Sequence, residues 1–448
     1  MFNKSASRLF WVLCSAGVLA SCSVLDDARA QREAEEAIER EGRIKMVLAD
    51  EALEPALELA DLTIELPDAA PVLSWPQSGG TASKAIGHVS AAANFAFDWR
   101  VNAGEGSNGR SALITPPVSS ETAVFVIDSA QVLSAQAISD GQLLWRKPLE
   151  SGSGRDRVGI GSGIAYGDGK LVIASGFGFV ATYDAASGDL IWKTDTEGPM
   201  TGSPTIKDGR VFVSSNNNEI MAFSYADGRV LWSDQAISES ARVLSSPSVA
   251  AIEDIVVVPF SSGEVISYLA ANGRRLWTDA LASAGNFTPI SAINDIGARP
   301  VLGGGMVFAA SQSGVMAGID GRTGNRLWQQ PLGATQAPAL IGGYLFVISV
   351  DAEVACIDAA TGQIVWVRQL EQYRNTKKKQ GRITYSGPLM ASDKLVLASS
   401  RGEVLALDPQ TGADLNRLSI GDDVYIEPIA AQGRIIILTD EGRLVAIN

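Results

Sequence analysis

Histidine and cysteine, the residue types most used in nucleophilic catalysis and in zinc sites, are scarce in this 448-residue chain, which has one His and three Cys. His88 is the only histidine, which excludes a Ser-His-Asp or Cys-His arrangement and a zinc site built on histidines. The neighbouring acids Asp422 and Asp423 lie in a predicted loop. Such a pair could serve glycoside hydrolysis only at a defined separation, which the sequence does not give. We therefore expect no catalytic residue and no metal or cofactor site.

The strongest chemical signal is a cysteine near the start of the chain. A positively charged start precedes the apolar run 9–20, which is too short to span a bilayer and is typical of a signal peptide. The run ends in Leu19-Ala20-Ser21-Cys22, which matches the bacterial lipobox; the alternative is an ordinary signal peptide with a coincidental cysteine. We predict removal of residues 1–21, lipidation of Cys22 and, because Ser23 follows, anchoring in the outer membrane facing the periplasm.

The other cysteines and the net charge narrow the range of functions. Cys14 lies in the predicted signal peptide, and Cys356 stands alone in a predicted strand, where a lone cysteine is usually a small buried hydrophobe. The formal net charge of −14 and the pI near 4.7 argue against nucleic acid or an anionic lipid surface as the main partner.

Residues 22–74 have the composition of a tether between the lipid and the folded body. Residues 26–41 are rich in Ala, Glu and Arg with opposite charges at i,i+4 spacing, which fits a short solvated helix, although disorder fits nearly as well. Residues 44–71 are acidic and contain Ala, Leu and Pro, which we interpret as a tether that also wraps the folded body. We predict that the folded body spans residues 75–448.

The folded body is a repeat. Seven tryptophans recur at intervals of 38 to 51 residues, at Trp99, Trp145, Trp192, Trp232, Trp277, Trp328 and Trp366. The last six each follow a Gly-x-x-x-Trp turn and strand, as in Thr361-Gly362-Gln-Ile-Val-Trp366, and an eighth copy ends in Asn416 instead of Trp. A period of 40 to 50 residues with four short strands per unit is typical of a β-propeller. We expect each tryptophan to pack between neighbouring sheets.

The two ends of the repeat complement each other. Residues 428–448 supply three strands and then stop, while residues 96–101 near the start form a lone outer strand with its tryptophan. Pairing the two would close the ring and remove the edge that an open array would expose. We therefore predict an all-β, eight-bladed propeller of four-stranded antiparallel blades, with the last blade closed by the N-terminal outer strand.

The repeat Ala-x-Asp-x-x-Thr-Gly-x-x-x-Trp, seen at 356–366 and its neighbours, resembles the blade repeat of the pyrroloquinoline-quinone (PQQ) dehydrogenases. That resemblance covers residues 96–448 and implies an eight-bladed propeller closed in a similar way. Those enzymes use an acidic base, calcium ligands and a vicinal Cys-Cys disulfide, and this chain has no Cys-Cys and no Cys-x-x-Cys-His. The resemblance therefore implies the fold, while a quinoprotein-like enzyme or ligand-binding propeller stays as the rival interpretation.

The lipobox, the tether and the quinoprotein-type propeller together resemble the BamB family. These are the lipoprotein subunits of the BAM complex, the machine that folds and inserts β-barrel proteins into the bacterial outer membrane. Trp75-Pro-Gln-Ser-Gly-Gly80 resembles the segment that precedes the first blade in alphaproteobacterial members. The resemblance implies a non-enzymatic protein without cofactor. Its implied partners are the periplasmic domains of the barrel subunit BamA and unfolded outer-membrane clients.

The resemblance also implies a partner-binding site on the long connections between blades. In the family, an Arg preceded by leucines and an Asp pair contact BamA. The Arg matches Arg242, and the first Asp matches Asp295. The leucine positions hold Glu239 and Ala241, and the second Asp position holds Gly297. We therefore expect the aliphatic part of the contact to come from Val243, Leu244 or Ile296.

Two mechanisms remain open at this stage: a scaffold that orients the barrel subunit, or an exposed strand edge that binds unfolded clients. A third interpretation is a cell-envelope interaction protein with another partner. Lys377-Lys378-Lys379 is interpreted as a solvated loop tip, with an anionic headgroup or an acidic partner as the alternative.

Overall fold

The computed structural model describes residues 53–59, 62–149, 161–215, 217–237, 247–281 and 296–448. The chain divides into the units Met1–Ala52 and Leu53–Asn448, and the described residues all belong to the second. The predicted signal peptide, Cys22 and the helix over 26–41 therefore lie outside the described residues.

Most described strands belong to four-stranded antiparallel sheets that follow one another along the chain. The first contains β4 (Val118–Ser119), β5 (Ala123–Ile127), β6 (Val132–Ala137) and β7 (Leu143–Pro148). The second contains β8 (Ser162–Gly167), β9 (Lys170–Ser175), β10 (Phe179–Asp184) and β11 (Leu190–Asp195). The third contains β12 (Thr205–Lys207), β13 (Arg210–Ser214), β14 (Glu219–Ser224) and β15 (Val230–Gln235).

The next three sheets repeat this order. One contains β16 (Ala250–Ile252), β17 (Ile255–Pro259), β18 (Glu264–Leu269) and β19 (Arg275–Ala280). Another contains β20 (Val301–Gly303), β21 (Met306–Ala310), β22 (Met316–Asp320) and β23 (Arg326–Gln330). The third of them contains β24 (Ala339–Ile341), β25 (Tyr344–Ile348), β26 (Glu353–Asp358) and β27 (Ile364–Gln369).

The last two sheets each combine strands from the start of the folded body with strands from its end. A six-stranded sheet joins β1 (Ala70–Pro71) and β2 (Val89–Ser90) to β30 (Tyr385–Ala391), β31 (Lys394–Ser399), β32 (Glu403–Leu407) and β33 (Asp414–Ser419). The final sheet contains β34 (Ile429–Ala431), β35 (Arg434–Leu438), β36 (Arg443–Ile447) and β3 (Phe97–Asn102). The remaining elements are the hairpin β28 (Tyr373–Asn375)–β29 (Gln380–Arg382) and the 3-10 turn η1 (Leu57–Leu59).

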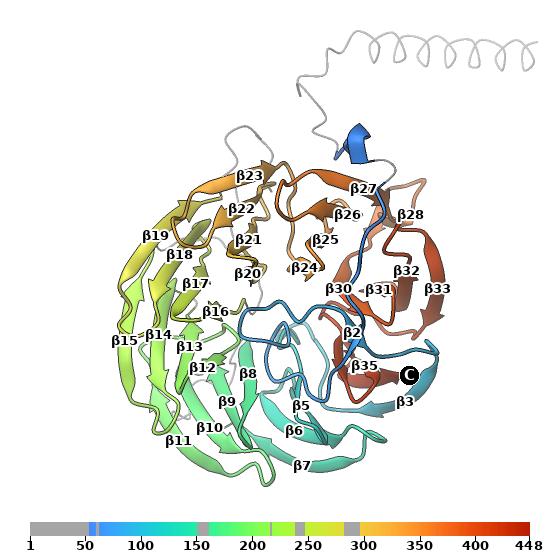
Figure 1. Cartoon of the computed structure of the whole chain (residues 1–448). Helices are drawn as coiled ribbons and strands as arrows, with labels where there is room; N and C mark the ends of the chain where they lie inside the picture. Colours follow the sequence, from blue (N-terminus) through green and yellow to red (C-terminus); the bar gives the residue numbers. More distant parts are fainter. Residues whose placement is uncertain (1–52, 60–61, 150–160, 216, 238–246, 282–295) are drawn as a thin grey trace, which may run out of the picture. The chain divides into compact units, whose positions relative to one another are not determined.

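The sheets are arranged as a propeller, with the first strand of each toward the centre and β7, β11, β15, β19 and β23 at the rim (Figure 1). The middle strands are runs of buried aliphatic and aromatic residues, such as Leu345–Ile348 of β25, because neighbouring sheets cover both of their faces. Fourth strands such as β7 and β11 face solvent on the rim and are largely exposed. The structure thus has the all-β propeller of four-stranded antiparallel blades that the repeat predicts.

The predicted pairing of the two chain ends is present. Strand β3 pairs antiparallel with β36, with Trp99 opposite Ala446 and Val101 opposite Leu444. Beyond the strand, Ala96 and Asn448 exchange backbone hydrogen bonds of 3.0 and 2.9 Å. The final sheet is therefore held together by non-covalent pairing between the two ends of the folded body.

The recurrent tryptophans link each sheet to the next, as predicted. Each indole N–H donates to a backbone carbonyl of the following sheet at 2.9–3.2 Å, in the pairs Trp99–Ile138, Trp145–Ala185, Trp192–Tyr225, Trp232–Ala270, Trp277–Gly321, Trp328–Ala359 and Trp366–Pro409. The ring also lies on the turn glycine of that next sheet. A Cβ on Gly228, whose φ is +73°, would lie 2.3 Å from the Trp192 ring. Glycine is required there for both its backbone conformation and its lack of a side chain.

The contact between tryptophan and turn glycine also explains why the eighth copy of the repeat has Asn416 in place of tryptophan. Asn416 stands on β33, opposite Ala406, at the position that holds Trp366 in the previous sheet. In the following sheet the third and fourth strands, β36 and β3, are joined by no turn, because the chain ends Asn448 and Ala96 meet there. An indole at position 416 would therefore find no turn glycine to lie on and no turn carbonyl to bond.

Candidate functional site

The antiparallel order of the strands gives the propeller two different faces. Connections from the rim strand of one sheet to the inner strand of the next, such as residues 370–384, lie on one face, which we call the connector face. Turns between first and second strands and between third and fourth strands lie on the opposite face, which we call the turn face. Gly342–Gly343 and Asp358–Gly362 are examples of such turns.

A plug formed by residues 75–92 closes the turn-face end of the central channel. It forms hydrogen bonds with the inner strands of successive sheets. The Trp75 carbonyl accepts from the Ser119 N–H at 2.8 Å, and further along the plug the Ala82 carbonyl accepts from the Ala251 N–H at 2.8 Å. Strand β2 in the plug then pairs in parallel with β30 through Val89 and Ala391. In Figure 1 this segment is the blue chain that crosses the middle of the ring. The inner strands thus find hydrogen-bond partners that the ring alone would leave missing.

A cavity of about 270 Å³ lies above the plug, toward the connector face. It is lined by Ser78 of the plug and by the ends of the connections, namely residues 113–114, 116, 247–248, 297–299, 335–337, 384–386 and 425–427. Its volume is near the lower limit of roughly 300 Å³ for small-molecule sites. Tyr385 lines it, and burial raises the pKa of this phenol to about 12, so it is not a ready base.

Two buried charged residues, Lys84 and Glu427, and the partly buried Arg299 lie where the plug meets the cavity. The Arg299 guanidinium pairs with the Glu427 carboxylate at 2.6 Å, and Ser78 Oγ lies 3.5 Å from the other Glu427 oxygen. Lys84 Nζ, also buried, donates to Thr205 Oγ1 at 3.0 Å. Burial, and then the neighbouring Arg299 charge, hold the pKa of Lys84 well below its usual value, while Glu427 opposes the shift. These groups bond one another and the plug, which points to a structural role.

The residues around the channel do not fit a quinone–calcium site. The one lining carboxylate, Glu427, is already held by Arg299. Among the described residues, no group of three or more His, Cys, Asp or Glu side chains could hold a metal ion. The sequence also lacks the vicinal cysteines of the quinoprotein enzymes. We derive no chemical step through such a cofactor.

The other residues considered for chemistry have structural partners. His88 is buried, with Nδ1 donating to the Pro67 carbonyl at 2.8 Å and Nε2 accepting from the Asp393 N–H at 2.9 Å. Asp422 pairs with Arg443, and Asp423 with Arg374, both at 2.7 Å. The free thiol of Cys356 is buried in β26, and that burial raises its pKa. These contacts explain the residues without catalysis.

Of the five predicted partner-binding residues, only Ile296 lies within the described part of the chain. Arg242, Val243, Leu244 and Asp295 fall outside the described residues. The expectation for Ile296 is wrong: its side chain is only 1% exposed and packs in the cluster that contains Trp277 and Leu302. It directly precedes the loop that leads into β20, where an aliphatic side chain fills the space between sheets and cannot reach a partner.

Sequence reasoning missed an exposed aliphatic residue on the same connection as Arg242. Ile237 is 62% exposed. Its backbone is held on both sides, since its N–H donates to Glu264 at 3.2 Å and its carbonyl accepts from Asn218 Nδ2 at 2.5 Å. A lone Ile after a strand gives no sequence signal of exposure, because isoleucines also occur throughout the core.

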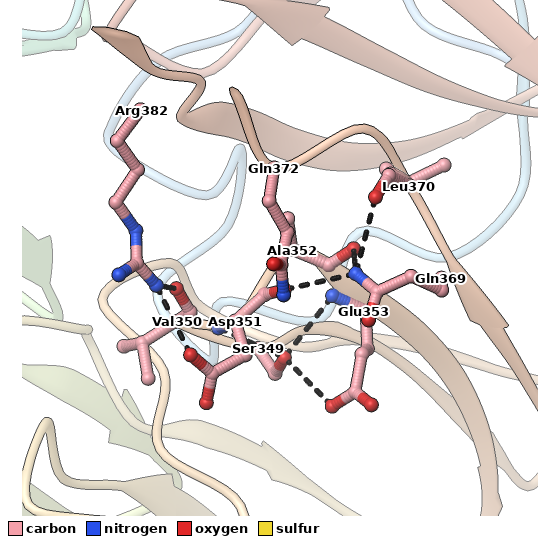
Figure 2. Close-up of polar contacts among 9 residues, drawn as sticks. All are labelled: Ser349, Val350, Asp351, Ala352, Glu353, Gln369, Leu370, Gln372 and Arg382. Carbon is pink, nitrogen blue, oxygen red and sulfur yellow. Dashed lines mark hydrogen bonds and ion pairs between the residues drawn. The ribbon is translucent and has the colours of Figure 1, made fainter. Parts of the chain in front are cut away.

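The connector face also carries an anchored hairpin, β28–β29, whose tip holds Lys377, Lys378 and Lys379. Figure 2 shows how its base is fixed to the neighbouring sheet. Arg382 bonds the carbonyl of Val350 and pairs with Asp351 at 3.1 Å, and Gln372 bonds the carbonyl of Asp351 at 2.9 Å. The predicted loop is thus a short hairpin with an exposed basic tip.

No described helix has the length and apolar character needed to cross a membrane.

Comparison with known proteins identifies the family and supports the fold. The family model described as outer membrane protein assembly factor BamB matches residues 128–368 and 369–448. The assembly factor BamB of Moranella endobia is 23% identical over 335 residues, covering 74% of this chain and 84% of that protein. The same factor of Burkholderia pseudomallei is 24% identical over 347 residues, covering 77% and 85%.

Solved structures show the same fold. The crystal structure of BamB from Moraxella catarrhalis superposes with a TM-score of 0.64 at 18% identity, covering 78% of this chain and 98% of that one. Quinohemoprotein alcohol dehydrogenase from Comamonas testosteroni gives 0.63 at 13% identity, covering 84% and 81%. The fold defines a β-propeller of the quinoprotein type, closed by its own chain ends. Within that class, the chain belongs to the family of the outer membrane protein assembly factor BamB.

Proposed function

We propose that this protein is a non-catalytic scaffold of the BAM complex that assists folding and insertion of outer-membrane β-barrel proteins. The observation that carries the proposal is the family match, which extends over residues 128–448. The channel supports it, because the plug fills one end and the charged groups beside the cavity bond each other. We also propose a ring of eight blades, in which β30–β33 of the six-stranded sheet form one blade.

The proposed partner is the periplasmic part of a BamA-like barrel protein, bound at the connector face. Arg242 and Asp295 are its charged contacts and Val243 and Leu244 its aliphatic ones. Ile237 takes the place that Ile296 cannot fill, because it is exposed and its backbone is fixed. Unfolded barrel clients are the second class of partner in this proposal.

The test is a mild-detergent pull-down from native membranes with the lipidated protein. Arg242→Glu, Asp295→Arg and Ile237→Asp should each reduce recovery of a large barrel protein with periplasmic domains. Arg322→Glu, on an exposed turn of the opposite face, is the matched control and should not. Retention by all variants would leave the scaffold function in place and refute the contact site. Absence of any barrel protein would refute the function and turn attention to quinone binding.

We also propose that Cys22 carries the lipid that holds the protein on the periplasmic face of the outer membrane. Two or more acyl chains give stable anchoring, where one chain alone gives only marginal binding. Metabolic labelling with an alkyne palmitate should label the wild-type protein and not Cys22→Ala, and Cys22→Ala should leave the membrane fraction. A labelled Cys22→Ala protein would contradict the assignment.

A further inference from the structure

Three successive rim strands expose pairs of large apolar side chains. In β7, β11 and β15 the two residues before the tryptophan are the pairs Leu143–Leu144, Leu190–Ile191 and Val230–Leu231. Each of these six side chains is 37–54% exposed. Single exposed aliphatic residues are common on protein surfaces, but paired ones repeated on adjacent strands indicate an interaction surface. We call these six residues the rim pairs.

The same pair on β27 is covered. Ile364 and Val365 occupy the equivalent positions before Trp366, yet they are only 4% and 7% exposed. Their cover is the chain's own segment Leu53–Leu59, whose turn η1 is the blue coil near β27 in Figure 1. One rim strand of this molecule therefore shows what can bind to such a pair.

The segment Leu53–Leu59 binds β27 through one backbone hydrogen bond and two apolar contacts. Ala56 N–H donates to the Ile364 carbonyl at 2.8 Å, on the free edge of the strand. Leu53 packs in the cluster that contains Ile364, and Leu59 packs against the cluster that contains Val365. Leu57, between them, is 90% exposed. The segment thus places residues i, i+3 and i+6 against the strand and offers one backbone donor.

Other rim strands lack the pair because a charged residue replaces one of its members, which is the second in β3 (Asp98, after Phe97) and the first in β19, β23 and β33. In β19 and β23 the first position holds Arg275 and Arg326, which pair with aspartates of the preceding sheet, Asp234 and Asp279, at 2.6 and 2.7 Å. In β33 the position holds Asp414, which pairs with Arg368 at 3.0 Å. The uncovered pairs are therefore confined to one arc of three sheets.

We propose that the rim pairs of β7, β11 and β15 are a docking surface for a short aliphatic segment of another polypeptide. The segment binds as Leu53–Leu59 does on β27, with aliphatic residues at i, i+3 and i+6 and a backbone N–H donated to the carbonyl of Leu143, Leu190 or Val230. A polypeptide is the favoured occupant because the seated example is one and because the strand edge offers carbonyls that a lipid tail cannot use. The surface is separate from the connector-face contact proposed above.

The test uses a labelled synthetic peptide with the sequence of residues 50–61, Asp-Glu-Ala-Leu-Glu-Pro-Ala-Leu-Glu-Leu-Ala-Asp, added to the full lipidated protein in detergent. Saturable binding is expected, measured by fluorescence anisotropy. Replacing all three pairs by serine should weaken it about tenfold or more, since each lost aliphatic contact removes buried apolar area. Leu327→Ser, at a single exposed leucine on β23, is the matched control and should leave the affinity unchanged.

Three outcomes would overturn the proposal. The first is a peptide that does not bind, or binds equally well to the serine variant. The second is amide-exchange protection at β27 only, which would mean exchange with the chain's own cover. The third is a rim that is already occupied. A second copy of the protein on the rim would appear as a dimer in ultracentrifugation, and residues 23–49 on the rim would appear as peptide binding only after these residues are deleted. Unchanged thermal unfolding of the serine variant would confirm that lost binding reflects the surface and not misfolding.

Discussion

Strands β27 and β11 have the same local sequence pattern but different surroundings. Both place two apolar residues before a tryptophan whose indole bonds the next sheet. On β27 the pair is buried under Leu53–Leu59, and on β11 the pair Leu190–Ile191 faces solvent. The difference comes from a segment that lies about three hundred residues away along the chain from β27. Burial of a rim strand is therefore a property of what covers it and not of its own sequence.

The largest expected difference concerns the tryptophans of the two strands. Trp366 is 8% exposed, so Trp366→Ala should lower the free energy of unfolding by about 3–5 kcal/mol. Trp192 is only partly buried, so Trp192→Ala should cost about 1–3 kcal/mol. Urea unfolding followed by far-UV circular dichroism measures both. Equal losses would show that the difference in exposure between the two rings does not affect their contribution to stability.

The apolar pairs themselves give a sharper version of the same test. Ile364→Ser removes a buried side chain and places a hydroxyl under the cover, which should cost about 2–4 kcal/mol. Leu190→Ser, at an exposed position, should change stability by no more than about 0.5 kcal/mol. Thermal unfolding of the two variants side by side decides the matter. A loss of more than that at Leu190 would mean that the rim pair is part of the core.

Removing the cover should make β27 behave like β11. Leu53→Ser should cost about 1–2 kcal/mol, because the Leu53 side chain leaves its buried cluster. Hydrogen exchange should accelerate over residues 364–366 and stay unchanged over 190–192. Leu57→Ser, at a fully solvated position on the same segment, is the control and should alter neither. Unaltered exchange at 364–366 would contradict the covering role.

The smallest expected effect is a pH dependence of stability. It should arise in the plug, which holds the buried Lys84, and not in the cover Leu53–Leu59, whose side-chain contacts with β27 are apolar. The pKa of Lys84 is lowered in the folded protein, mainly by burial, and is about 10.4 in the unfolded chain. Between these values the unfolded state binds more protons, so stability should rise with pH across this window. Lys84→Met should remove that rise. Urea midpoints between pH 7 and 9.5 test this, and an unchanged slope in Lys84→Met would refute it.

Sequence reasoning was strongest where the repeat imposes a pattern. The interval between tryptophans predicted the sheets and the packing of Trp192 or Trp366 between them, and the strands left over at the two ends predicted the pairing of β3 with β36. These features follow from periodicity, which a sequence shows directly. The missing tryptophan at Asn416 was visible in the sequence, but its reason required the geometry of the closing sheet.

Sequence reasoning was weakest where residues far apart along the chain make contact without a pattern. The composition of residues 44–71 predicted a tether and wrapping segment, but it did not indicate which contacts this segment makes. Ile64 is buried, and its backbone bonds Gln410 in both directions. The plug and its Lys84 gave no signal either, because single bonds to successive strands leave no periodicity. Ile296 and Ile237 show the same limit at the candidate site, since one is buried and the other exposed without any local difference in type.

The closure of the ring by β3 and β36 sets the order in which the protein can be completed. Residues 97–102 leave the ribosome long before their partner strand, residues 443–447. Until then the growing chain has two open sheet edges, which favour pairing with other chains. Export of the whole chain before folding would shorten that exposed interval. Loss of residues 443–447 would remove the partner of β3 and leave both sheet edges unpaired.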